Sequence, residues 1–180
     1  LGSMKRLVAP AIVIALLAAA CGSDKGGGGS TTSPPDPDAV VLTAGYEGGF
    51  VPVEYAYQPL PQYVLLADGR LVSQGPVAAI YPGPVWPNLQ VGQLSDEQLV
   101  QVRDLVEIIG LPAMDGTYDT TGSDIVADAA DAVVVYFDEN GSHRYAAYAL
   151  GLEDDPEPPR SDLLRLFETL DSFAATLASE

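Results

Sequence analysis

The chain has 180 residues, with 25 acidic and 8 basic side chains and a formal net charge of −17. This balance argues against nucleic acid as a partner, because such proteins need a basic face to neutralise phosphates, and against electrostatic docking on anionic lipid. The length is sufficient for one globular domain with additional segments.

Residues 4–20 have the order of a secretory signal peptide. Lys5 and Arg6 form a basic start, and the apolar run over 7–20 is too short to span a bilayer. Small residues then lead directly to Cys21, the only cysteine of the chain. Because no second cysteine is present to form a disulfide, the stability of the folded part is expected to come from its core.

The segment from Leu17 to Ser23, with Cys21 directly after three alanines, resembles the lipobox of bacterial lipoproteins. The resemblance implies that the signal is removed before Cys21 and that a diacylglyceryl group is attached to its thiol. A thiolate is the good nucleophile for such a step, and Ala18 stands where the family usually has leucine. The expected protein is held on the cell membrane by lipid and faces away from the cytoplasm. An unlipidated signal peptide with a chance cysteine is the alternative.

The segment after Cys21 has the composition of a tether. Residues 22–39 are rich in glycine, serine, threonine and proline, so their first half is expected to be a flexible coil and their second half stiffer. The serines and threonines over 30–33 are either bare or glycosylated. We therefore expect a lipidated cysteine and linker over 21–39 and one globular domain over 40–180.

The first half of that domain is expected to consist of strands. Residues 40–42 begin an extended segment, 45–49 have turn composition, and 50–57 are aromatic and β-branched. Residues 62–73 predict a hairpin, since Asp68-Gly69 supplies the positive φ angles of a two-residue turn.

A proline-rich loop follows over 81–87. Its three prolines exclude a helix or a central strand, and it contains Tyr81 and the only tryptophan, Trp86. Tyr81 and Trp86 form either an exposed aromatic recognition site or, on the other interpretation, a contact by which Trp86 holds the loop on the core.

The second half contains two helices and a strand pair. Ser95 and Gln98 form a capping box that begins a helix over 95–109, which Gly110 and Pro112 end. Residues 132–137 read as a central strand and 142–150 as its antiparallel partner. A second amphipathic helix is predicted from Ser161 onward. The sequence therefore predicts an α+β fold, with a mainly antiparallel sheet built from hairpins and two amphipathic helices packed on it.

This order of elements over 45–178 is similar to that of uncharacterised single-domain lipoproteins of high-GC Gram-positive bacteria. The shared features are the Asp-Gly hairpin, Leu-Ser-x-Glu-Gln at the start of a helix, an aspartate-rich loop, a strand pair and a last helix. The family has no assigned activity, so the resemblance implies fold and location only.

Catalytic motifs are scarce, and the sequence favours a function other than catalysis. His143 is the only histidine and is expected to be exposed near a hairpin tip, and the nucleophile-elbow pattern Gly-x-Ser-x-Gly does not occur. The aspartate-rich loop either holds calcium through its carboxylates or simply forms turns. Its candidate ligands are Asp115, Asp119, Asp124, Asp128 and Asp131.

The function expected from these features is an interaction module that binds an unknown envelope protein, with no cofactor unless calcium is held. A carboxylate-dependent envelope hydrolase would need two facing acids in a cleft. A small-ligand carrier would need an apolar cavity between the sheet and the helices.

Overall fold

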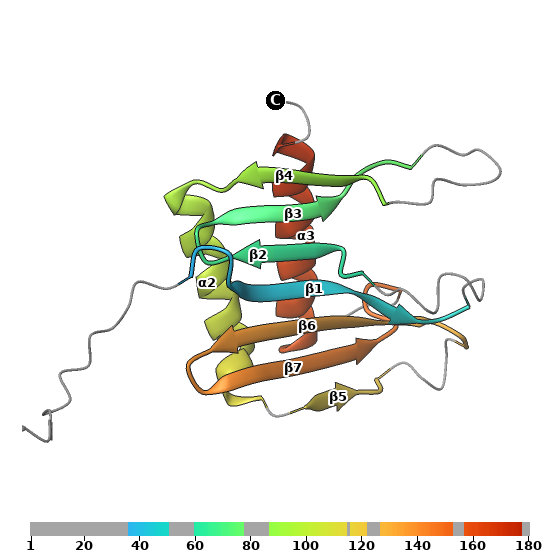
Figure 1. Ribbon diagram of the computed structural model, residues 1–180. Coiled ribbons are helices and arrows are strands. Elements are labelled where there is room, and N and C mark those ends of the chain that lie inside the picture. The colour runs from blue at the N-terminus through green and yellow to red at the C-terminus, as the bar shows by residue number, and fades with distance from the viewer. Residues whose placement is uncertain are drawn as a thin grey trace, which may run out of the picture. The chain divides into compact units, whose positions relative to one another are not determined.

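Strands and helices form two layers, with α2 and α3 packed on one face of a sheet in the computed structural model (Figure 1). The structure describes residues 36–50, 60–77, 87–114, 116–121, 127–152 and 157–177, all within the compact unit Pro34–Glu180. In these ranges the sheet has seven strands in the order β4-β3-β2-β1-β6-β7-β5. Neighbouring strands are antiparallel except β5 and β7, which are parallel. The predicted α+β class is confirmed.

The elements have the following bounds. The strands are β1 (Val40–Gly48), β2 (Tyr63–Leu66), β3 (Arg70–Gln74), β4 (Leu89–Gln93), β5 (Thr117–Asp119), β6 (Ala130–Asp138) and β7 (Gly141–Tyr148). The helices are α2 (Asp96–Ile109), the short 3-10 helix η1 (Leu111–Ala113) and α3 (Arg160–Leu177).

The β2–β3 hairpin and helix α2 form where their local signals predicted them. Gly69 has a φ of +88° in the hairpin turn, a value that residues with a Cβ rarely adopt. The predicted two-residue turn is wrong in its type, because Asp68 does not have the positive φ that such a turn requires. The Ser95 hydroxyl accepts the backbone N–H of Gln98, while the Gln98 side chain accepts the backbone N–H of Ser95. Gly110 ends α2 in the left-handed conformation, with a φ of +81°.

The turn predicted over 45–49 is wrong, because β1 continues to Gly48. Gly45 pairs with Val133 of β6 and is buried in the middle of the sheet. A Cβ at Gly45 would lie 2.8 Å from the backbone nitrogen of Gln62. This glycine therefore permits the close approach of another segment rather than a reversal of the chain. The strand predicted over 50–57 lies outside the described residues, except for Phe50.

The core lies between the helices and one face of the sheet. Apolar side chains alternate along each strand, so those that face α2 and α3 are buried, as in Leu42, Leu71, Val134 and Tyr145. Helix α3 contributes Leu163, Leu166, Phe167 and Leu170, all at most 2% exposed. The predicted central strand β6, its partner β7 and the last helix are confirmed.

Strands β4 and β5 were not predicted. In β4, Gly92 faces α3, where a Cβ would lie 2.6 Å from the Leu177 Cδ1 atom. β5 has only three residues and pairs in parallel with β7. These two strands form the edges of the sheet.

Candidate binding surface

The residues singled out from the sequence are only partly described. Cys21, Tyr81, Trp86, Asp115 and Asp124 lie outside the described residues. Asp119, Asp128 and Asp131 are described, so three of the five candidate calcium ligands can be placed.

Asp119 lies at the end of β5 and interacts with a buried cation. Its carboxylate accepts the Thr121 backbone N–H at 2.9 Å and the Tyr145 hydroxyl at 3.3 Å, and the Arg160 Nη1 atom lies 3.8 Å away. Burial opposes the ionisation of Asp119, but the Thr121 hydrogen bonds and the Arg160 charge outweigh it and lower its pKa. Arg160 also donates to the Tyr148 carbonyl at 3.0 Å. The negative charge of Asp119 thus partly neutralises the positive charge of Arg160 at the start of α3.

Asp131 and Asp128 are placed differently. Asp131 is paired with Tyr148, and its neighbour Ala132 faces the core, so Asp131 lies on the opposite side of the sheet from the helices. It accepts the Tyr118 hydroxyl at 3.0 Å. Asp128 is exposed, with a φ of +58°. Within the described ranges, no group of three or more histidine, cysteine or acidic residues is placed to hold a metal.

His143 differs from the exposed residue that the sequence predicted. Its side chain is only 15% exposed, and its Nε2 atom lies 3.1 Å from the Asp138 carboxylate. The ring also stacks on Tyr136, with centroids 6.3 Å apart. The His143 hydrogen bond is the main cause that lowers the pKa of Asp138. This pair therefore fixes the tip of the β6–β7 hairpin.

The sheet face opposite α2 and α3, here named the open face, was not predicted from the sequence. None of the described helices packs on it. A row of β-branched side chains crosses it, because the strand register aligns one residue from each of five successive strands. This β-branched row consists of Val91, Val72, Val64, Thr43 and Val135.

The β-branched row is partly accessible and carries no charge. Val91 is 61% exposed at the edge of the sheet, and the other four members are half-buried. With strands spaced about 4.8 Å apart, the row is about 19 Å long. Leu89, on the same edge strand, is 51% exposed. An uncharged, partly exposed surface of this kind resembles the centre of a protein–protein interface more than a solvated sheet face.

Charged groups lie at the margins of the open face. Beyond Val135, Arg144 forms an ion pair with Glu47 at 2.9 Å. At the turn of the β2–β3 hairpin, Arg70 contacts the carboxylates of both Asp68 and Asp38. Together with Asp131, these groups comprise four carboxylates and two arginines. The open face is therefore an uncharged strip with an acidic rim.

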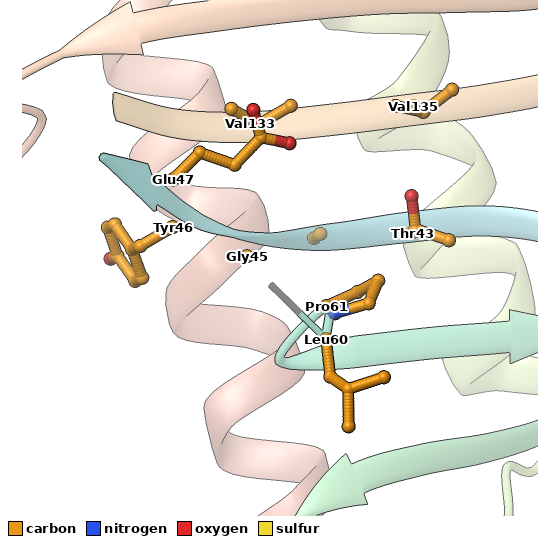
Figure 2. Close-up of a pocket in the computed structure, with 9 residues that line it drawn as sticks. Thr43, Gly45, Tyr46, Glu47, Leu60, Pro61, Val133 and Val135 are labelled. Carbon is orange, nitrogen blue, oxygen red and sulfur yellow. The ribbon is translucent and has the colours of Figure 1, made fainter. Parts of the chain in front are cut away.

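A small hollow lies on the open face beside Gly45. Figure 2 shows Leu60 and Pro61 on one side of it and Val133 and Val135 on the other, with the Glu47 side chain beside Val133. Its volume is about 40 Å³, which accommodates a few water molecules. The hollow is one recess in the open face, bordered by the Leu60-Pro61 segment that approaches Gly45.

A polar cluster on the helix side of the sheet joins β2 to α3. The Tyr63 hydroxyl contacts the Asp171 carboxylate of α3, and the Gln62 amide donates to the same hydroxyl at 2.7 Å. Desolvation, followed by the hydrogen bond to Asp171, raises the pKa of Tyr63 far above its ordinary value. Tyr63 therefore stays protonated and links β2 to α3.

No family model, curated protein or solved structure matches the chain. Within the part of the chain that the structure describes, no helix combines the length and apolar character needed to cross a bilayer.

Proposed function

We propose that this protein is a lipid-anchored, extracytoplasmic interaction module that binds an envelope protein through the open face of its sheet. The observation that carries the proposal is the β-branched row, an uncharged line across five strands that no described helix packs on. The lipobox-like segment at Cys21 supplies the anchor, and residues 22–39 supply the tether.

The chemistry of the open face indicates the kind of partner. Its half-buried valines favour an apolar contact at the centre, while Glu47, Asp131, Asp38 and Asp68 at the margins favour lysine and arginine around it. The net charge of −17 would also speed the encounter with a basic surface. The partner is therefore a protein with an apolar patch surrounded by basic residues.

The test is chemical crosslinking in intact cells of the anchored protein, followed by capture and mass spectrometry. We expect one reproducible envelope protein whose yield falls at least tenfold with Val72→Lys, which places a charge in the β-branched row. Val100→Lys is the matched control, because Val100 is 49% exposed on helix α2, away from the open face. Equal capture by both variants and the wild type would refute the proposal.

The anchor has its own test. Cys21→Ser removes the thiol that would accept the lipid, so we expect the protein to be released or to remain as unprocessed precursor. Fractionation and intact mass measure both results. A Cys21→Ser protein that stays on the membrane at the mature mass would contradict lipid anchoring, whatever the open face binds.

A further inference from the structure

Edge strand β4 has main-chain groups directed away from the sheet. The Gly75 N–H donates to the Asn88 carbonyl at 2.7 Å, and the Leu94 N–H donates to the Gly69 carbonyl at 3.1 Å. In an antiparallel ladder the direction alternates, so Gln90 and Gly92 also point toward β3. Leu89, Val91 and Gln93 therefore direct their N–H and C=O groups outward. Among the described residues, no strand pairs with that side of β4.

The strand lacks the features that usually prevent edge pairing. Its sequence, Leu-Gln-Val-Gly-Gln, contains no charge and no proline, and its register with β3 has no bulge. The opposite edge is protected, because β5 has three residues and ends at Asp119, which faces Arg160. One edge of the sheet is therefore suited to pairing and the other is not.

We propose that β4 pairs with β4 of a second copy of this chain to form a two-fold dimer with a continuous sheet. The outward residues Leu89, Val91 and Gln93 are spaced evenly about Val91. An antiparallel copy centred there places Val91 opposite Val91 of the second copy and Leu89 opposite its Gln93. Every outward N–H then meets an outward C=O, which is the narrow hydrogen-bonded pairing of an antiparallel ladder.

The charge distribution and the β-branched row both fit this occupant. Each copy carries a net charge of −17, yet β4 carries none, so no charged side chain of β4 opposes its counterpart in the second copy. The two-fold axis is perpendicular to the sheet, which keeps both open faces on one side. Val91 then continues the β-branched row into the second copy and doubles the length of the uncharged strip. Dimer formation requires only the edge strand β4 and does not depend on the partner proposed for the open face.

The experiment is disulfide crosslinking of the full chain in intact cells, read on a non-reducing gel. Opposed Cα atoms in a narrow pair are about 5.5 Å apart, within the range of a disulfide. We expect Val91→Cys to form a covalent dimer at least fivefold more efficiently than Val72→Cys, which lies on the same face one strand inward. Coexpressed Leu89→Cys and Gln93→Cys copies are expected to crosslink to each other.

Two further variants separate the possible outcomes. Adding Gln93→Pro to Val91→Cys removes an outward N–H without removing a bond to β3, so the yield should fall at least fivefold, whereas Gln93→Ala should preserve it. Stronger crosslinking through Val72→Cys than through Val91→Cys would mean that copies meet through their open faces, and would overturn the proposal. So would an equal, low yield from both. The wild-type chain, whose only cysteine is Cys21, measures the background.

Discussion

The two faces of the sheet are both rich in apolar residues, but they use different ones and bury them differently. The helix face carries Leu42, Leu71 and Tyr145, each at most 1% exposed. The open face carries valine and threonine in register, with Val91 61% exposed at the edge. Large side chains fill the space against the helices, whereas β-branched side chains form a flat surface on a pleated strand. The first face forms the core, whereas the second is buried at Ala146 of β7 but exposed at the β4 edge.

Adjacent residues of β3 provide the largest test of this difference. Leu71→Ala should lower the free energy of unfolding by about 2–5 kcal/mol, because it leaves a cavity beneath the helices. Val72→Ala, one residue away on the open face, should cost less than about 1 kcal/mol. Urea unfolding of the two variants gives both values. Similar losses would show that the open face is as much a core as the helix face.

Two aspartates extend the comparison to charged groups. Asp119 faces the helix layer beside the buried Arg160, so Asp119→Asn should cost about 1–3 kcal/mol at pH 7. Asp131 contacts the exposed Tyr118 on the open face, and Asp131→Asn should cost less than about 0.5 kcal/mol.

The Asp119 effect should also depend on pH with a defined sign. Because the pKa of Asp119 is lower in the folded protein, its contribution is complete above the unfolded value of 3.8 and is lost as pH falls through the folded pKa. The difference in unfolding free energy between the wild type and Asp119→Asn should therefore shrink between pH 5 and the acid limit of folding. A difference that is constant across this range would contradict the stabilising role of the ionised carboxylate.

After Leu71→Ala and Asp119→Asn, the smallest of the three expected destabilisations comes from helix α2 itself. Ser95→Ala removes the cap of α2 without altering either face, so it should cost about 1 kcal/mol. Ser142→Ala, at an exposed position of β7, is the control and should be close to neutral. Thermal or urea unfolding measures both. A neutral Ser95→Ala would mean that packing alone positions α2.

The sequence predicted the elements whose signals are local. Asp68-Gly69 located the turn of one hairpin, although only Gly69 has a positive φ, and Ser95, Gln98 and Gly110 specified both ends of α2. It did not predict that Gly45 lies inside a strand, because the reason for that glycine is the approach of Gln62 from a segment remote in the sequence. The same holds for Gly92 of β4, which makes room for Leu177 at the other end of the chain.

The open face was missed for a related reason. Val64, Val72 and Val91 are unremarkable in the sequence, and only the register of four strand pairs aligns them with Thr43 and Val135. The aspartates that are close in the sequence are separated in the structure, because Asp119 and Asp131 lie on opposite faces of the sheet. Spacing along the chain carried no information on either arrangement.

The central claim is that the open face, rather than the helix side, contacts a partner protein in the envelope. The most direct measurement places a photo-crosslinkable residue at Val64, Val72 or Val135 of the anchored protein, and at Val100 or Ile108 of α2 for comparison. We expect the three open-face positions to crosslink to the same envelope protein and the two helix positions to give at most background. Equal yields from the two faces, or a stronger yield from α2, would contradict the account.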